Sequence, residues 1–382
     1  MLEVYTMQQT NLNPVSTVDS TKEFPTISQP KTIGFFSVGP DREYIPSAEN
    51  LKYLRLPKSV PDKPLRIDLN EGFQIRKPKP DSAKHERIDH LLRFIVENEL
   101  HLRERISEAD HNKRLNCDFV CFRGLLRMVM CTPYEWKTGW IILASRYKKT
   151  IYLCAQDTPE KIAEEANQTE QQKRFCYYGF KFEQHILADD PNSLPDTESP
   201  VLESEEFCVL FRTTLERKRI MYGAEMDGII SNESVKNNLC VDHLQRLEFV
   251  EVKVKRTETN QRQVDNFYRF KTRNWWCQSF LVNIQRLFVG LRNDGGFVDE
   301  IKEMSLKELD RSSRQFWSAS VCTAFLSQFL DTVQLKMQGI NCPHTVYRFE
   351  YDARSGNILF GVQEGRNNDS FLPNWYCSTI LK

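Results

Sequence analysis

Residues 247–254 read Leu-Glu-Phe-Val-Glu-Val-Lys-Val, a pattern of apolar and charged residues that predicts a β-strand. Side chains two residues apart on a strand point to the same face. The three valines therefore line a face suited to packing in a core, and Glu251 shares the other face with Lys253. A solvated ion pair would explain this Glu-x-Lys pair taken alone, so its interpretation depends on the acidic segments elsewhere in the chain.

Two further acidic segments precede this strand. Residues 179–183 read Gly-Phe-Lys-Phe-Glu, and residues 221–228 read Met-Tyr-Gly-Ala-Glu-Met-Asp-Gly. Both are expected as strands, which would place Glu225 and Asp227 on one face. Neighbouring carboxylates repel each other, and burying either without a partner is costly. A sheet that keeps this pair at its centre requires compensating cations, although an exposed edge remains the alternative for each segment taken singly.

A divalent cation is the compensation that fits these residue types. Hard ions such as Mg²⁺ take oxygen ligands and retain waters, usually in the company of substrate phosphates. The Glu of Glu-x-Lys would hold metal, and the Lys would contact a phosphate or orient the attacking water. Two ions about 3.5–4 Å apart can stabilise both the attacking and the leaving oxygen of a phosphoryl displacement. The residues thus indicate metal-dependent phosphodiester hydrolysis.

In this order the segments resemble the DXO-type decapping exoribonuclease family, a branch of the PD-(D/E)XK-like nucleases. The family pattern is an Arg, then Gly-hydrophobic-x-hydrophobic-Glu, Glu-hydrophobic-Asp and Glu-hydrophobic-Lys. The matching residues here are Arg123 in Cys-Phe-Arg-Gly, then Glu183, Glu225 with Asp227, and Glu251 with Lys253. The segment 275–280, Trp-Trp-Cys-Gln-Ser-Phe, is similar to a family segment whose Gln lies in the active site. The resemblance spans roughly residues 65–375, and Phe122 stands where some relatives have Trp.

The resemblance implies a role for each matched position. The expected ligands of Mg²⁺ or Mn²⁺, bound as two ions, are Glu183, Glu225, Asp227, Glu251 and the backbone carbonyl of Val252. Lys253 and Gln278 would position the nucleophilic water or the scissile phosphate, and Arg123 would contact RNA phosphate. Together the expected catalytic residues are Glu183, Glu225, Asp227, Glu251, Lys253 and Gln278.

The resemblance also implies substrates and partners. Family members remove incomplete 5′ caps, such as unmethylated guanosine, and cofactor caps such as NAD and FAD. They release pyrophosphate from 5′-triphosphate RNA, and some degrade RNA from 5′ to 3′. Two other interpretations stay open: a DNA-directed nuclease of the same broad fold, and a non-catalytic RNA-binding scaffold that stabilises a separate 5′–3′ exoribonuclease.

The charge distribution agrees with binding at an RNA end. Lys plus Arg number 52 and Asp plus Glu number 52, which argues against a protein that coats long nucleic acids. Residues 253–273 nevertheless carry seven basic side chains against two acidic ones. Tyr268, Trp275 and Trp276 lie in or beside this stretch and would be able to stack on bases, with a core position as the alternative for the tryptophans.

Length and composition set the broader frame. With 382 residues, 40% hydrophobic and 27% charged, the chain has the ordinary globular mix. We expect a mobile polar leader over residues 1–30 and a single domain over residues 31–382, with an acidic loop inserted near residues 188–206. No apolar run is long enough to span a membrane. The eleven scattered cysteines, none in a C-x-x-C pair, and the lack of a secretory signal favour reduced thiols in the nucleus or cytoplasm and no structural zinc. We also expect a monomer.

The expected elements alternate between strands and helices. The patterns predict helices near residues 88–100, 157–174, 265–285 and 307–337, and strands over 119–126, 140–143, 150–153, most of 176–256, 288–292 and a hairpin at 347–362. This mixture predicts an α/β (mixed α+β) protein, with a central mixed β-sheet flanked by helices and a PD-(D/E)XK-like nuclease core.

Overall fold

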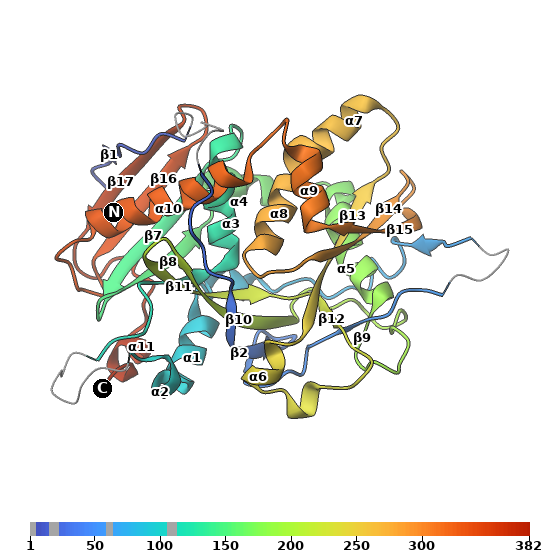
Figure 1. Ribbon diagram of the computed structural model, residues 1–382, viewed down its shortest axis with the longest axis horizontal. Coiled ribbons are helices and arrows are strands. Elements are labelled where there is room, and N and C mark those ends of the chain that lie inside the picture. The colour runs from blue at the N-terminus through green and yellow to red at the C-terminus, as the bar shows by residue number, and fades with distance from the viewer. Residues whose placement is uncertain (1–4, 15–22, 59–63, 105–112) are drawn as a thin grey trace.

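The computed structural model describes residues 5–14, 23–58, 64–104 and 113–382. Within these residues the strands form two mixed sheets that lie side by side (Figure 1). The mixed class expected from the sequence is confirmed, and its strands are divided between the two sheets.

The large sheet has ten strands. Its parallel pairs are those that the central strand β6 makes with both of its neighbours, and the other pairs are antiparallel. In spatial order the strands are β1 (Gln8–Gln9), β17 (Asn357–Gln363), β16 (Val346–Asp352), β7 (Trp140–Tyr147), β8 (Thr150–Gln156), β6 (Phe119–Phe122), β11 (Lys218–Glu225), β10 (Glu206–Leu215), β2 (Lys31–Val38) and β3 (Tyr44–Ile45).

The small sheet has seven strands. Its order is β5 (Ile67–Asp68), β15 (Phe297–Ser305), β14 (Arg286–Arg292), β13 (Glu248–Arg256), β12 (Gly228–Ile230), β4 (Tyr53–Leu54) and β9 (Leu187–Ala188). The chain passes from the large sheet into the small one between β11 and β12, a connection of two residues. This crossing brings the end of a large-sheet strand next to β13.

Helices fill the space between the sheets and cover their outer faces. The inner helices are α3 (Arg123–Cys131), α8 (Thr272–Phe280), α9 (Leu306–Ser313) and α10 (Ala319–Lys336), whose apolar side chains join one core cluster with both sheets. The outer face of the large sheet packs against α1 (Asp89–Glu97), α2 (Glu99–Leu102) and α11 (Asn374–Thr379), and that of the small sheet against α5 (Glu170–Ile186). In Figure 1, α3 and α8 lie in the middle of the molecule, between the strands of the two sheets.

The remaining helices are short. They are α4 (Pro159–Ala166), α6 (Val241–Leu244), α7 (Gln261–Asn266), a π-helix (Phe267–Lys271), and 3₁₀ turns at Asp81–His85, Thr132–Tyr134 and Lys236–Asn238. Among the residues described, no helix has the length and apolar character needed to cross a membrane.

Two of the predicted strand regions are helical in part. The strand expected over 119–126 ends at Phe122, and residues 176–186 belong to α5. The buried residues of α5 are Tyr177, Tyr178, Lys181, Phe182 and Ile186, which is helical spacing. Apolar residues also alternate in Gly-Phe-Lys-Phe-Glu, but over five residues this alternation is equally compatible with one face of a helix. Thr169 begins α5 with a capping box that includes Gln172, a start signal that the prediction did not use.

Other expected boundaries also shift. The helix predicted near 307–337 is divided into α9 and α10, and that near 265–285 is the continuous series α7, π-helix and α8. The leader is partly docked rather than mobile: β1 pairs with β17, and the Thr10 side chain donates a hydrogen bond to the Ile358 carbonyl at 2.8 Å. Residues 1–4 and 15–22 of the leader lie outside the described residues.

Candidate active site

The crossing between the two sheets carries two of the predicted carboxylates. Glu225 is the last residue of β11, and Asp227 follows it in the connection to β12 rather than within a strand, as had been expected. The extended chain still alternates here, because Met226 is buried in the core while its neighbours are not. Asp227 Oδ2 accepts a hydrogen bond from the backbone N–H of Val252 at 2.6 Å, which fixes the carboxylate against β13.

Glu251 is the most deeply buried carboxylate of the site, with 0% of the residue exposed. Its Oε1 accepts hydrogen bonds from Gln278 Nε2 at 2.5 Å and from the Lys253 ammonium group. The neighbouring valines of β13 pack in the core beneath α5, as the alternating pattern predicted. A fully buried carboxylate is tolerated only when charges and hydrogen bonds compensate it, and β13 and α8 supply both here.

Arg123 ties the two sheets together at this point. It is the first residue of α3 and is 7% exposed. Its Nη2 donates to the backbone carbonyl of Glu225 at 2.9 Å, and its Nη1 lies 3.5 Å from Glu251 Oε2. Neither Nη1 nor Oε2 has a hydrogen-bond partner, although both atoms are buried. Such buried, unsatisfied polar atoms are typical of a place where a ligand, water or ion completes the bonding.

Burial and mutual repulsion raise the pKa values of three carboxyl groups of the site. Burial, and then repulsion by Glu251, raises the pKa of Asp227 to about 6. Burial and then the charge of Asp227 raise the pKa of Glu183 well above its usual value. The pKa of Glu225 rises to about 8, first because protein atoms displace water around the carboxyl and then because Glu206 repels it. These groups resist becoming anionic together unless a cation joins them.

The basic partners have the opposite effect on Glu251. Burial opposes its ionisation, but the charges of Lys253 and Arg123 outweigh burial and hold the pKa of Glu251 below its ordinary value. For Lys253, too, burial disfavours the charge, yet Glu251 and Asp227 raise the pKa of the ammonium group above its ordinary value. Lys253 is therefore a permanent cation at neutral pH rather than a base.

The donor set fits a hard cation, though the side chains are not yet arranged around one. Among the described residues, no three His, Cys, Asp or Glu side chains are gathered as a metal-binding group. The Lys253 ammonium instead contacts Glu251 and lies 3.8 Å from Asp227 Oδ2. All available ligands are nevertheless oxygens, the raised pKa values of Glu183, Glu225 and Asp227 favour added positive charge, and Glu251 Oε2 accepts no hydrogen bond. These are the properties that Mg²⁺ and similar ions require.

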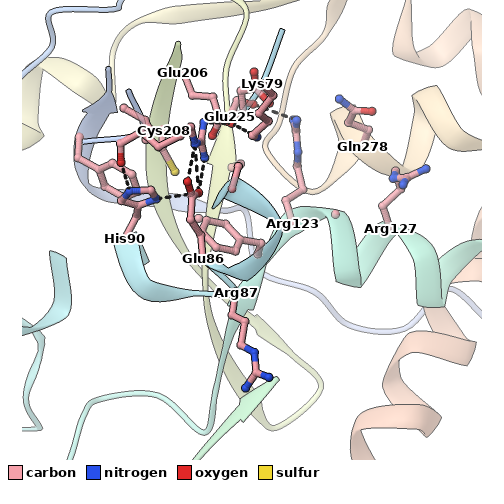
Figure 2. Close-up of a pocket in the computed structure, with 18 residues that line it drawn as sticks. Lys79, Glu86, Arg87, His90, Arg123, Arg127, Glu206, Cys208, Glu225 and Gln278 are labelled. Atoms are coloured by element: carbon pink, nitrogen blue, oxygen red, sulfur yellow. Dashed lines mark hydrogen bonds and ion pairs between the residues drawn. The ribbon is translucent and has the colours of Figure 1, made fainter. Parts of the chain in front are cut away.

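A cavity of about 560 Å³ opens beside this cluster and is called the 5′-end cavity below. In Figure 2, Arg123 and Arg127 rise from α3 on the side of Glu225 and Gln278, whereas Arg87 points away from them. Basic side chains in its lining outnumber acidic ones, five to three. Its charged lining residues are Arg42, Lys79, Glu86, Arg87, Arg123, Arg127, Glu206 and Glu225.

The sequence interpretation missed one wall of this cavity. Arg42 donates hydrogen bonds to Glu86 at 2.7 Å and to Glu206 at 2.6 Å. Lys79 donates to Glu206 at 2.7 Å (Figure 2). Glu206 had one available signal, because it begins β10, the strand that pairs with the Glu225 strand. The other three residues come from loops and a turn far apart in sequence, and no local pattern marks them.

Both tryptophans of the basic stretch belong to the core. Trp275 and Trp276 are 7% and 5% exposed. Trp276 stacks on Phe280 with ring centroids 4.5 Å apart, and it also packs against Trp317. Their role is to anchor α8, and thereby Gln278, between the sheets.

Residues 28–377 match the model of the RAI1-like PD-(D/E)XK nuclease family. The chain belongs to this family. It is 36% identical over 355 residues to the decapping and exoribonuclease protein Rai1 of Drosophila melanogaster, a match that covers 92% of both chains. It is 31% identical over 366 residues to the human decapping and exoribonuclease protein, covering 94% of this chain and 87% of the relative. The predicted family and class of enzyme, a nuclease, are confirmed.

Solved structures of RAI1 proteins share the fold. Candida albicans Rai1 in complex with pU5 and Mn²⁺ superposes with a TM-score of 0.78 at 18% identity, covering 99% of this chain and 100% of that chain. Scheffersomyces stipitis Rai1 in complex with (3′-NADP)⁺ and calcium gives a TM-score of 0.77 at 18% identity, covering 99% of each chain.

Proposed function

We propose that this RAI1-like nuclease hydrolyses phosphodiester or pyrophosphate bonds at the 5′ ends of RNA. Its substrates are incomplete caps, NAD and FAD caps, and 5′ triphosphates, with degradation from 5′ to 3′ following removal of the end. The observation that carries this proposal is the acid cluster around Lys253 and the buried Glu251, placed directly beside a basic cavity. Relatives that carry decapping and exoribonuclease names over nearly the whole chain support it.

Two divalent ions, Mg²⁺ or Mn²⁺, complete the proposed site and would supply polarisation of the scissile phosphate and an activated water. The residues that would hold them are Glu183, Glu225, Asp227, Glu251 and the carbonyl of Val252. Support for this set comes from the raised pKa values of three of the carboxyls and from the unpartnered Glu251 Oε2. The fold neighbours from Candida albicans and Scheffersomyces stipitis were solved with Mn²⁺ and calcium, respectively.

The chain's own polar side chains then act on the phosphate. Lys253 stays protonated at neutral pH, so its ammonium group stabilises negative charge on the reacting phosphate instead of removing a proton. Gln278 offers its Nε2 donor from the adjacent helix. Arg123 is held at the Glu225 carbonyl by Nη2, which leaves Nη1 available to a phosphate oxygen.

The 5′-end cavity accommodates the group that is removed. Its volume of about 560 Å³ suits a nucleotide-sized ligand. Arg127 and Lys79 bring positive charge for terminal phosphates, and Arg42, braced by Glu86 and Glu206, gives the wall a fixed shape. We further propose that the protein acts as a monomer in the nucleus or cytoplasm, where its eleven free cysteines would stay reduced.

A panel of 5′-end-labelled substrates tests the proposal. RNAs with a methylated cap, an unmethylated cap, an NAD cap, a triphosphate or a monophosphate are incubated with purified protein and Mg²⁺, next to a DNA oligonucleotide of matched sequence. We expect cleavage of the defective and cofactor-capped RNA ends and little cleavage of DNA. Preference for the DNA would instead identify a DNA-directed nuclease. Inertness on every RNA, combined with stimulation of an added 5′–3′ exoribonuclease, would identify a scaffold.

A further inference from the structure

A second cavity borders the catalytic cluster and shares no lining residue with the 5′-end cavity. It measures about 660 Å³ and lies between α5, the strands β13 and β14, and the π-helix. We call it the downstream groove; its defining residues are Lys255, Arg256, Phe267, Phe270, Lys271 and Arg292. It reaches Lys253 and Glu183, so it leads directly to the reacting centre.

The downstream groove differs in charge from a third cavity that also reaches the catalytic carboxylates. Five basic and two acidic side chains line the downstream groove. A third cavity, of about 450 Å³, also reaches Glu183 and Asp227, but eight acidic side chains and one lysine line it. A polyanion is repelled by the acidic cavity and attracted by the basic groove. Of these two cavities, the basic groove is therefore the one that attracts a single-stranded nucleic acid.

The π-helix provides the groove with aromatic surface. π-helical turns are rare and often occur at functional sites. Here the turn Phe267–Lys271 contributes Phe267 and Phe270 to the groove lining. The Lys255 ammonium lies over the Phe267 ring, 4.1 Å from its centroid, so this ring is already engaged. Phe270 is the second ring that the π-helix adds to the lining, and it is half-buried.

A tryptophan from a distant segment packs against Phe270 and enlarges the aromatic surface there. Trp136 lies in the loop between the Thr132–Tyr134 turn and β7, is 50% exposed, and meets Phe270 edge-on at a centroid distance of 5.5 Å. The Lys137 ammonium stands 5.9 Å from the same Phe270 ring. Exposed rings flanked by lysines are the surface on which proteins stack the bases of single strands. We call Trp136 and Phe270 the aromatic platform.

We propose that the downstream groove and the aromatic platform hold the RNA nucleotides on the 3′ side of the scissile bond, while the 5′ end occupies the 5′-end cavity. This inference rests on the proposed function and gives the RNA a direction through the molecule. If the platform binds RNA in this way, the length of an RNA determines how efficiently it is degraded. Long RNAs gain stacking on the platform, whereas a dinucleotide is too short to reach it.

The length dependence of cleavage tests the proposal. kcat/KM is measured for a 5′-triphosphate dinucleotide and for a 5′-triphosphate 12-mer with the same first two nucleotides. We expect Trp136→Ala and Phe270→Ala to reduce kcat/KM on the 12-mer by roughly fivefold to a hundredfold, the effect of losing one base stack. Both variants should keep the wild-type rate on the dinucleotide. Trp375→Ala serves as the control, because Trp375 is 38% exposed but lies in α11, on the outer face of the large sheet.

The outcomes separate this inference from the proposed function. An unchanged rate on the 12-mer, or an equal loss on both substrates, would overturn the assignment of the platform to RNA. If the wild-type protein cleaves neither substrate, the proposed function itself fails. Lys271 is exposed in the groove. If it contacts an RNA phosphate, the binding constant for the 12-mer should depend less steeply on salt concentration in Lys271→Gln than in the wild type.

Discussion

At the residue scale, Asp227 shows how the site is prepared for a cation. One of its oxygens accepts the Val252 N–H at 2.6 Å, so the side chain cannot turn away from Glu251 and Glu183. Its own ordinary pKa is 3.8, and burial with Glu251 raises that pKa to about 6. The folded protein without metal therefore holds protons on this cluster that the unfolded chain releases.

This proton uptake predicts the pH dependence of stability. A carboxyl whose pKa is raised in the folded state binds more protons than in the unfolded state, so stability falls as pH increases between the two pKa values. For Asp227 the window lies between about 4 and 6, and Glu225 extends it towards 8 with a smaller effect because it is exposed to solvent. In EDTA, the contribution of Asp227 to Tm should therefore fall by a few degrees as the pH rises from about 4 to about 6.

Asp227→Asn is the matched control for this measurement. The amide oxygen can still accept the Val252 N–H, but the side chain no longer titrates. Its curve of Tm against pH, recorded by differential scanning calorimetry, should be flatter than that of the wild type between pH 4 and 7. Parallel curves would show that Asp227 does not have a raised pKa.

At the element scale, the short connection from β11 to β12 determines the site, because it transfers the chain from one sheet to the other. Gly228 opens β12 at a point of close approach. A Cβ there would lie 2.8 Å from the Leu187 side chain and 3.1 Å from the carbonyl oxygen of Lys52. Any larger residue at this position would therefore force the Leu187 side chain and the backbone at Lys52 to shift.

Gly228→Ala should therefore displace Asp227. We expect a loss of ~1–3 kcal/mol in the free energy of unfolding, typical of overpacking. Turnover should fall even at temperatures where the variant is fully folded, because the displaced carboxylate, and not unfolding, then limits the reaction. Urea denaturation and RNA cleavage assays check both. Wild-type turnover in a folded variant would mean that the connection does not control the position of the carboxylate.

The helices and strands also show which parts of the site can be predicted from local sequence patterns. The strand with Glu251 and Lys253 was predicted because alternation with three valines is a local signal, and Glu225 with Asp227 followed for the same reason. Glu183 was placed on a strand because the alternation in 179–183 is too short to separate from the face of a helix. Glu86 and Glu206 were not found, since their approach to Arg42 depends on packing across the sheet, which no single segment encodes.

At the scale of the whole molecule, two sheets, α3 and α8 converge on one charged centre, where Arg123 and Lys253 face the carboxylates. A divalent ion that binds only the folded protein stabilises it by RT ln(1 + [L]/Kd). Saturating Mn²⁺ or Mg²⁺ should therefore raise Tm above the value in EDTA, and more strongly at pH 8 than at pH 6, because protons compete for the same oxygens.

This shift should be much smaller in Asp227→Asn. Calcium serves as a control for binding without turnover, because it also prefers oxygen ligands. A shift of equal size in the wild type and the variant would place the bound ion elsewhere in the protein.

The most direct test of the account is cleavage of a 5′-labelled triphosphate RNA by the wild type and Asp227→Asn, each assayed in EDTA and after addition of excess Mg²⁺. We expect product from the wild type only when Mg²⁺ is added, and a rate for Asp227→Asn that is lower by on the order of 10²–10³-fold with unchanged circular dichroism. Equal cleavage by both proteins in EDTA would contradict it.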